Sequence, residues 1–249
     1  MILIKNDLEI ALMRKAGKIV GETLNLLGKN IRPGITTAEL DKIAEEFITK
    51  QGAKPSFKGL YGFPASVCIS VNTTVVHGIP GDCILKDGDI VSVDCGACID
   101  GFHGDAARTF PVGNVSTEAK KLIEVTESSF FKGIEKAQIG NRLTDISNEI
   151  QKYVEAQGFS VVRDFVGHGI GRDVHESPNV PNFGKPRKGP KLVKGMALAI
   201  EPMINIGKYD VKTLSDGWTV VTADGSLAAH YENTIAILPE GPEILTLVK

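Results

Sequence analysis

An internal repeat constrains the fold of this chain more than any other feature of its sequence. Each half contains, in the same order, a glycine six residues before a leucine or isoleucine, a helical segment, a His-Gly-Ile tripeptide, an apolar run and a carboxylate. The landmarks are Gly34, His77 and Asp94 in the first half and Gly140, His168 and Glu201 in the second. Repetition over a long period indicates related structural units. We therefore expect one domain, residues 1–249, in which two related halves face each other across a pseudo-two-fold axis and direct histidines and carboxylates to a shared centre.

Hydrophobic periodicity predicts helices and strands in both halves. Apolar residues recur at helical spacing over about residues 7–27, 36–51, 117–136 and 144–157. Asn6 with Glu9 and Thr36 with Glu39 have the sequence of capping boxes, which mark the first turn of a helix. Apolar runs predict strands at residues 66–71, 89–94, 197–204, 219–221 and 234–238. Because no linker-like tract divides the chain, the expected fold class is α/β (α+β) within one domain.

Composition and charge argue against a nucleic-acid-binding protein and against a membrane protein. Hydrophobic residues make up 42% of the chain, charged residues make up 23%, and the formal net charge is −2. A chain without a basic field is a poor nucleic-acid binder. No stretch approaches the roughly 20 apolar residues that cross a bilayer, and the first residues lack the pattern of a secretory signal. We therefore expect a cytoplasmic protein with neither membrane nor nucleic acid as its substrate.

The four cysteines give no disulfide framework or structural zinc site. Cys68, Cys83, Cys95 and Cys98 are too sparse to cross-link a chain of this length, so we expect reduced thiols. Cys95 and Cys98 have the spacing of half a zinc or redox site. No second ligand pair exists at similar spacing, and a strand-like run rather than a helix start accompanies them. We interpret them as thiols packed near a strand end.

Four carboxylates stand beside apolar, strand-like runs: Asp94, Asp105, Glu201 and Glu232. A buried carboxylate is costly unless it is paired or bound to a metal. Asp105 follows Asp94 across a glycine-containing turn, so we expect it to return on an adjacent strand and meet Asp94. Two ionised carboxylates held close repel each other unless a cation neutralises them. Arg108 is the only cationic partner evident nearby in the sequence, which leaves most of this charge unpaired.

Histidines add a second kind of ligand. His168 lies between two glycines, and His175 follows it outside any predicted helix. One imidazole with mostly oxygen ligands suits a pair of divalent ions such as Mn, Fe, Co or Zn. Five such ligands can hold two ions about 3.5–4 Å apart, the usual spacing in two-metal hydrolytic sites. We assign no role to His103 and His230, which we expect to be structural or exposed to solvent.

Asp94, Asp105, His168, Glu201 and Glu232 resemble, in order, type and surroundings, the five metal ligands of the methionine aminopeptidases. The resemblance covers nearly the whole chain and includes residues 76–80, 100–105, 167–171 and 199–202. It implies the pita-bread fold, a pseudo-two-fold domain with a curved antiparallel sheet flanked by helices. It also implies removal of the initiator methionine from nascent proteins by water that two divalent ions activate, with a preference for a small second residue. The ions implied are Co, Mn, Fe, Zn or Ni.

The resemblance assigns a role to each ligand. Asp94 would hold one ion and His168 the other. Asp105 and Glu232 would bridge the two ions. Glu201 would bind the His168 ion and take part in proton transfer, which makes it both a ligand and a catalytic residue.

The resemblance also implies residues that contact the substrate. His175 would contact the scissile amide and its developing oxyanion, a large catalytic contribution in many enzymes. His77 would lie near the substrate backbone and the methionine pocket. The pocket walls implied are Phe57, Leu60, Phe63, Cys68, Val174 and Trp218. Some relatives carry cysteine, tyrosine and phenylalanine at positions 57, 60 and 174, so we expect a pocket of different shape here. For Trp218, core packing is the competing interpretation.

Further implications concern a monovalent cation and partners. A sodium or potassium site built largely of backbone oxygens is implied at Asn72, Thr74 and Ala228. The implied partners are the N-terminal methionine of nascent polypeptides and, transiently, the ribosome. We expect a monomer.

Four alternatives share the fold. Proline-directed aminopeptidases share the five ligands, but their chains are longer than this one and have an added N-terminal domain. Creatinase-like enzymes lack the metal pair. Type II methionine aminopeptidases carry a helical insertion, for which the short spacings from His175 to Glu201 and Glu232 leave no place, so the chain resembles the short bacterial type I form. Relatives that only bind partners would be expected to have lost ligands, and alanine at Asp105 would then leave their function intact.

Overall fold

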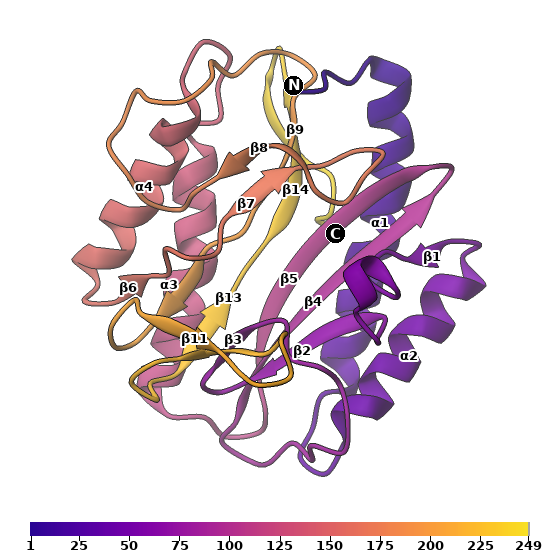
Figure 1. Ribbon diagram of the computed structural model, residues 1–249, viewed down its shortest axis with the longest axis vertical. Helices are drawn as coiled ribbons and strands as arrows, with labels where there is room; N and C mark the ends of the chain where they lie inside the picture. The colour runs from indigo at the N-terminus through magenta and orange to yellow at the C-terminus, as the bar shows by residue number, and fades with distance from the viewer. Residues whose placement is uncertain (249) are drawn as a thin grey trace.

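The computed structural model describes residues 1–248, which form the helices and strands labelled in Figure 1. The helices are α1 (Asp7–Asn30), α2 (Thr37–Lys50), α3 (Thr117–Ile134) and α4 (Leu143–Ala156). The strands are β1 (Lys54–Pro55), β2 (Val67–Val71), β3 (Thr74–Val76), β4 (Ile90–Ile99), β5 (Phe102–Pro111), β6 (Ser160–Val161), β7 (Gly167–Gly169), β8 (Glu176–Val180), β9 (Ala197–Ile200), β10 (Met203–Asn205), β11 (Val211–Thr213), β12 (Val220–Thr222), β13 (Ala228–His230), β14 (Asn233–Leu238) and β15 (Gly241–Ile244).

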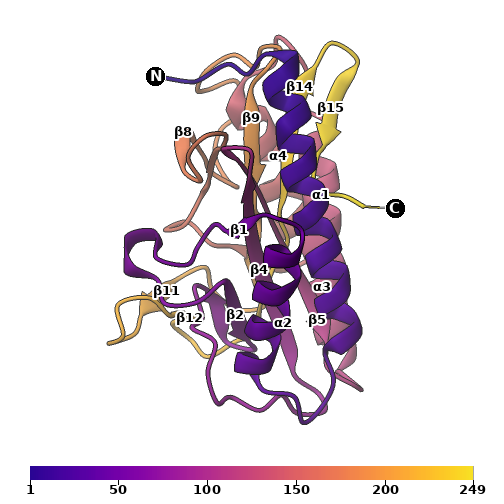
Figure 2. The same cartoon turned by 90° about the vertical axis from the view of Figure 1, so that its right-hand side faces the viewer.

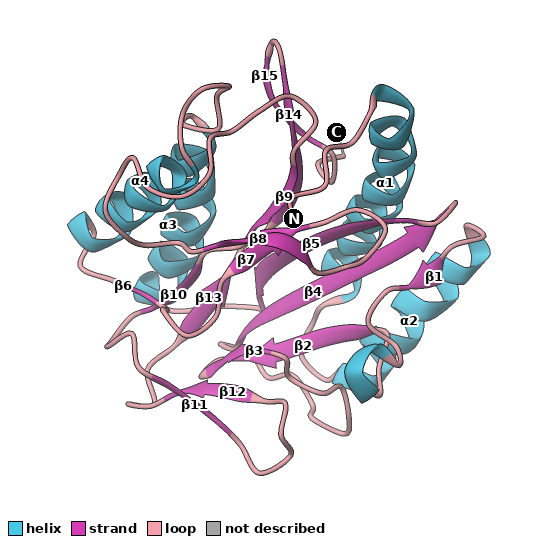
Figure 3. Ribbon diagram, turned by 45° about the horizontal axis from the view of Figure 1, so that its top comes forward, coloured by secondary structure: helices cyan, strands magenta, loops and turns pink. Residues whose placement is uncertain are grey.

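Helices flank curved antiparallel sheets, which confirms the predicted fold class. The helices cover the long strands from one side, and short strands such as β8, β11 and β12 lie on the other (Figure 2). The α1–α2 pair lies over the strands of the first half, and the α3–α4 pair lies over those of the second (Figure 3). Each helix pair encloses its own core cluster of apolar side chains against these strands. The side of the sheets away from the helices is therefore available for a site.

Side-chain caps fix the starts of α1 and α2 as predicted. The Asn6 side chain accepts a hydrogen bond from the backbone N–H of Glu9, and the Glu9 side chain accepts one from Asn6. Thr36 and Glu39 form the same reciprocal pair at α2. Among the helices formed by residues 1–248, none is long and apolar enough to cross a membrane.

The central strands of the two halves are arranged alike. β4 lies between β2 and β5, β9 lies between β7 and β14, and all these pairs are antiparallel. A glycine with left-handed φ precedes each central strand, Gly88 at 96° before β4 and Gly195 at 85° before β9. The two parts of the chain therefore share this strand arrangement, and their origin as two related halves of one domain stays a prediction. The two histidines of the repeated His-Gly-Ile tripeptide, however, do not occupy equivalent positions in the fold. His168 lies on β7, whereas His77 follows β3 in a different sheet.

Two strands differ from their predicted bounds by more than one residue. β4 continues through Asp94 to Ile99, so Asp94 lies inside a strand rather than at its end. The small residues after Asp94 stay extended because β5 pairs with each of them. The predicted strand 197–204 is divided into β9 and β10, because Pro202 has no N–H to give to a sheet. That break places Glu201 directly after β9.

The four cysteines are free thiols in this fold. Cys95 and Cys98 both lie on β4, so a spacing of three residues points their side chains to opposite faces of the sheet. Cys95 is buried and Cys98 is half-buried. The two thiols therefore cannot share a metal or form a disulfide, in agreement with their interpretation as packing residues.

Candidate metal centre

The β4–β5 hairpin brings Asp94 and Asp105 together. Its turn consists of Asp100 and Gly101, whose positive φ values of 53° and 76° are those favoured in two-residue hairpin loops. Asp94 lies opposite Ala107, two residues beyond Asp105. The two carboxylates therefore project from the same face of the hairpin as diagonal neighbours. The glycine-containing turn predicted that these two carboxylates would lie close together.

Strands of the second half add the other candidate ligands. His168 lies on β7 and pairs with β9, whose chain continues into Glu201. Glu232 lies between β13 and β14. Its backbone N–H donates to the carbonyl of Ala107 at 2.9 Å, and the Ala107 N–H donates to the carbonyl of Glu232 at 3.3 Å. These bonds fasten the second half to β5 and bring Glu232 up to Asp105.

The structure brings together all five residues that the sequence named as ligands. Ligand atoms of Asp105, His168 and Glu232 lie within 4.8 Å of one another, close enough to hold a metal ion. His168 Nε2 lies 3.6 Å from Glu201 Oε1 and 3.9 Å from Asp105 Oδ2. Asp94 lines the same cavity. The side chains of Asp105 and Glu232 are buried, so solvent does little to screen their charges.

Burial strongly perturbs the four carboxyls. It raises the pKa of Asp94 from 3.8 to about 7. It also raises the pKa values of Asp105, Glu201 and Glu232 well above their usual range, and repulsion between the carboxylates adds to this rise. Within residues 1–248, no lysine or arginine forms an ion pair with any of the four. The guanidinium of Arg108 donates instead to the backbone carbonyl of Glu232.

His168 presents a lone pair to these carboxylates. Its Nδ1 lies 2.9 Å from the carbonyl oxygen of Gly169, and a carbonyl only accepts, so Nδ1 carries the proton. Nε2 then faces Glu201 and Asp105 without a hydrogen. Burial lowers the pKa of His168 to about 4, so the ring is neutral at neutral pH. A lone pair facing carboxylate oxygens is repulsive unless a cation lies between them.

Unpaired buried oxygens show that the residues fit divalent ions. Within the described part of the chain, Asp94 Oδ1, Asp105 Oδ1 and Glu232 Oε1 are buried without a hydrogen-bond partner. Buried acceptors without donors are costly and rare. A metal ion would satisfy them and separate the repelling charges. Four carboxylates and one neutral imidazole form an oxygen-rich set suited to Mn, Fe, Co or Zn.

His230 also lies beside this centre, which was not expected from the sequence. His230 is fully buried rather than exposed to solvent, and its Nε2 lies 3.7 Å from Glu201 Oε2 and 3.9 Å from Glu232 Oε2. It precedes Glu232 by two residues, a spacing that puts both side chains on one face of an extended chain. This spacing is the sequence feature from which the proximity of His230 could have been predicted. His103 is structural, since its Nδ1 shares a hydrogen bond of 2.8 Å with the Ser56 hydroxyl and it does not line the cavity.

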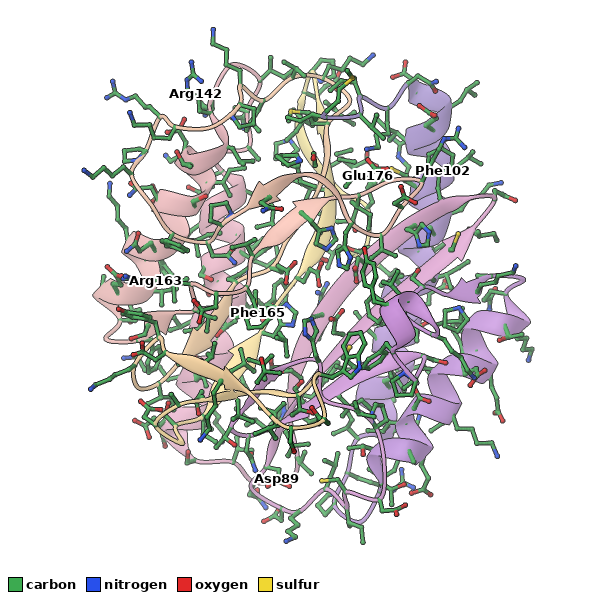
Figure 4. The ribbon with its side chains drawn as sticks, viewed as in Figure 1. Asp89, Phe102, Arg142, Arg163, Phe165 and Glu176 are labelled. Carbon is green, nitrogen blue, oxygen red and sulfur yellow. The ribbon has the colours of Figure 1, made fainter. Side chains whose placement is uncertain are left out.

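A cavity of about 560 Å³ contains these ligands together with His77 and His175. His77 has a left-handed φ of 58°, a strained conformation for a residue with a side chain and one that concentrates at functional sites. Its ring meets that of Phe165, near the centre of Figure 4, edge-on at 5.5 Å. The His175 ring lies 4.5 Å from the His168 ring and stacks with Tyr61. Both histidines therefore line the cavity that contains the predicted ligands, and their roles toward the substrate stay predictions.

One apolar cluster forms a wall of the cavity. It contains all six residues predicted to surround the substrate side chain, Phe57, Leu60, Phe63, Cys68, Val174 and Trp218. All of these except Val174, which packs within the cluster, line the cavity itself. Phe63 and Trp218 meet edge-to-face at 5.1 Å. Trp218 is half-buried and lines the cavity, so it is not a residue of the sealed core. Tyr61, Phe165 and Met203 also line the cavity and lie outside the motifs that the sequence analysis used.

The three positions implied for a monovalent cation lie close together in the fold. The backbone N–H of Ala228 donates to the carbonyl of Asn72 at 2.9 Å. Asn72 has a left-handed φ of 54°, and Thr74 begins β3 two residues later. The cation site itself stays a prediction.

Fold and donor set define a metal-dependent hydrolase, and residues 11–239 match the model of metallopeptidase family M24. The methionine aminopeptidase of Clostridium perfringens is 77% identical over 249 residues, all of both chains. Methionine aminopeptidase 1 of Bacillus subtilis is 58% identical over 248 residues, with 100% of each chain covered. The crystal structure of methionine aminopeptidase from Thermotoga maritima matches with a TM-score of 0.98 at 48% identity, again over 100% of both chains. The chain belongs to family M24 and, within it, to the methionine aminopeptidases.

This membership confirms the resemblance read from the sequence, including the pita-bread fold and the short bacterial type I form. The matches to the Clostridium perfringens and Bacillus subtilis relatives cover the full length of both chains, as expected for the short form.

Proposed function

We propose that this chain removes the N-terminal methionine from newly made polypeptides by hydrolysing the first peptide bond. It would do so as one catalytic domain built from two related halves. The observation that carries the proposal is the unpaired, oxygen-rich ligand set lying in the same cavity as an apolar wall of aromatic, aliphatic and thiol side chains. Such a wall suits a thioether side chain, and the ligand set suits hydrolytic metals. Family membership supports the same activity.

The ligand residues would hold the metal and move one proton. Asp94, Asp105, His168, Glu201 and Glu232 are the residues that would bind two divalent ions. Bound there, the ions would polarise the scissile carbonyl and make a water molecule nucleophilic at neutral pH. The carboxylate of Glu201 would take a proton from the attacking water and pass it to the leaving amine. Its buried position and raised pKa suit a group that both accepts and returns a proton.

The two accessory histidines would orient the substrate. Burial lowers the pKa values of His77 and His175, so both rings are neutral at neutral pH. A neutral ring still has one N–H to donate. His175, next to His168, would donate to the oxygen that becomes negative in the transition state. His77, edge-on to Trp218 at 6.4 Å, would contact the substrate backbone beside the methionine pocket.

Peptide hydrolysis is the direct test of this function. Metal-stripped protein is incubated with Met-Gly-Met-Met in the presence or absence of Mn, Co or Fe, and free methionine is measured. We expect metal-dependent release of the first methionine, with Met-Lys-Met-Met left largely uncut because a small second residue is preferred. Folded protein that cleaves nothing with any of the metals would refute the proposal, and a binding protein would then be the alternative to pursue.

Replacement of His175 by alanine should separate transition-state stabilisation from metal binding. We expect kcat to fall by about 10²–10³-fold, the usual cost of losing one oxyanion donor, with a smaller change in KM. Metal content should stay normal because His175 is not a ligand. His103→Ala is the matched control, since His103 is bonded to Ser56 outside the cavity. Unchanged kcat in His175→Ala, or a loss of metal, would contradict the role.

The proposal includes several finer features of the protein. These are the identity of the divalent metal, the sodium or potassium site, a transient contact with the ribosome, the monomeric state and the cytoplasmic location. Metal analysis of the purified protein would test the identity of the divalent metal. Cosedimentation with ribosomes would test the ribosome contact.

A further inference from the structure

A buried ion pair joins the N-terminal segment to the loop that carries His175. The ammonium of Lys5 contacts Glu176 Oε2, and the two side chains are only 4% and 3% exposed. Glu176 directly follows His175 and begins β8. Lys5 precedes α1 and belongs to no helix or strand. Neither residue lies in a motif that the sequence analysis assigned to the site.

Both partners of this pair are themselves held in place. The Lys5 backbone N–H donates to the carbonyl of Gly195 at 2.8 Å, and its ammonium also donates to the carbonyl of Leu3 at 3.1 Å. The other carboxylate oxygen of Glu176 accepts from the backbone N–H of Arg172 at 2.8 Å. One carboxylate therefore connects Lys5 to the backbone of residues 172–176.

The loop packs closely against the lysine. A Cβ at Gly171 would clash with Lys5 Cε and lie 2.6 Å from Glu176 Oε1, so the two paired side chains would have to shift to accommodate it. The Gly171 carbonyl accepts from the N–H of His103 at 2.8 Å, which fastens the start of the loop to β5. The Arg172 guanidinium lies 4.5 Å from the Phe102 ring. Glu176 and Phe102 are both labelled in Figure 4, in the part of the molecule close to one end of α1.

His175 depends on this loop for its position. Among residues 1–248, no side-chain hydrogen bond holds its imidazole. The ring contacts His168 edge-on at 4.5 Å and stacks on Tyr61, which is largely exposed. An imidazole that must donate to a developing charge needs accurate placement, since an error of about 1 Å costs about 100-fold in rate.

We propose that Lys5 and Glu176 are positioning residues for His175. Their ion pair holds residues 172–176 so that the imidazole faces His168 and the cavity. This inference rests on the proposed function, in which His175 contacts the reacting amide. Removing one partner leaves the other charge buried and uncompensated, so the loop has to rearrange to give that charge water.

The test uses steady-state kinetics on the metal-loaded protein with Met-Gly-Met-Met. Lys5→Met and Glu176→Gln are expected to lower kcat by about 10–100-fold while KM and Mn affinity, measured by calorimetry, change by less than about twofold. Lys5→Arg keeps the charge and should recover most of the activity. The Lys5→Met/Glu176→Gln double variant should lose less than the product of the two single losses, because both remove the same interaction.

Lys194→Met is the matched control. Lys194 directly precedes Gly195 and pairs with Asp7 at 3.0 Å, near the same N-terminal segment, but both side chains are largely exposed. Its replacement should leave kcat unchanged, because this pair does not reach the His175 loop. If Lys5→Met fails to fold, Glu176→Gln carries the test, since the amide keeps an oxygen for the Arg172 N–H.

A readout without turnover distinguishes positioning from general destabilisation. With ¹⁵N-labelled histidine, the ring signal of His175, assigned with His175→Ala, should shift or broaden in Lys5→Met and Glu176→Gln but not in Lys194→Met. Wild-type kcat in both variants, or an unchanged His175 signal, would overturn the proposal. An inactive wild-type enzyme would instead refute the proposed function, and the His175 signal would still decide whether the pair positions the ring.

Discussion

Replacing Asp105 with asparagine is expected to lower kcat/KM by about 10³-fold or more and to reduce the bound metal. The amide has nearly the same shape as the carboxylate, so the β4–β5 hairpin should be preserved. It has one acceptor oxygen instead of two and no negative charge, however, and its NH₂ group would point toward a cation. Because Asp105 lies with His168 and Glu232 in the tightest group of ligand atoms, its loss should weaken the whole centre.

Asp100→Asn provides the control for this prediction. Asp100 occupies the turn of the same hairpin, where it pairs with Lys15 at the surface at 3.1 Å. The same chemical change there should leave both metal content and kcat/KM close to normal, because an exposed ion pair contributes little. Equal activity of Asp105→Asn and wild type would remove Asp105 from the metal centre and favour the alternative of a binding protein without catalysis.

The local part of the site was predictable from the sequence because its cause is local. Asp100 and Gly101 specify a two-residue turn, and the turn fixes which face of the hairpin carries Asp94 and Asp105. Capping boxes at Asn6 and Thr36 fixed the starts of two helices for the same reason. These features depend on residues within a few positions of one another, which sequence patterns record well.

Features that depend on distant segments were not predictable in this way. β4 was predicted to end at Asp94, because the small residues after it have no apolar pattern, and only pairing with β5 keeps them extended. Strands of two or three residues such as β6 and β7 exist because the partner strand orders them. Lys5 could not be placed against Glu176 by any spacing rule, since 171 residues separate them. His230 was assigned no role, because its distance from the other ligands depends on how β13 packs against the loop that carries Glu201.

The unpaired carboxyls of the metal centre are also expected to make the metal-free protein unstable at high pH. Burial raises the folded pKa of Asp94 to about 7 from an ordinary value of 3.8, and it raises the pKa values of Asp105, Glu201 and Glu232 well above their usual range. The native state therefore holds more protons than the unfolded state. The stability from a raised carboxyl pKa is fully present below the unfolded pKa and is lost as the pH rises through the folded pKa.

Protonation of histidines limits the pH range in which the loss of stability caused by the carboxyls can be measured separately. Burial lowers the pKa values of His77 and His168 to about 4 and that of His230 to about 3. These groups destabilise the fold as the pH falls below about 6.5, where the unfolded histidines become protonated. As the pH rises above about 6.5, histidines lose their charge in both states and the carboxyls dominate the balance. Near the top of the window, the buried thiols of Cys68 and Cys95, whose pKa values burial raises, add to the same loss. The measurement therefore belongs between pH 6.5 and 8.5.

In that window, the free energy of unfolding of metal-free protein should fall by about 1.4 kcal/mol per pH unit for each proton that only the native state retains. One such proton gives a loss of about 3 kcal/mol between pH 6.5 and 8.5, to be measured by urea unfolding in the presence of a chelator. Saturating Mn should restore the stability at pH 8.5, because it binds the native state and replaces the protons.

Asp105→Asn should change stability in the direction opposite to its effect on catalysis. It removes one buried charge from the repelling group, so metal-free Asp105→Asn should be more stable than metal-free wild type at pH 8.5 and should show a shallower pH dependence. The same residue would then be costly to the fold and necessary to the reaction, as expected where charges are gathered for a ligand rather than for stability. A flat pH profile for the metal-free wild type, or a metal-free variant less stable than wild type at pH 8.5, would show that the four carboxyls are not held against their mutual repulsion.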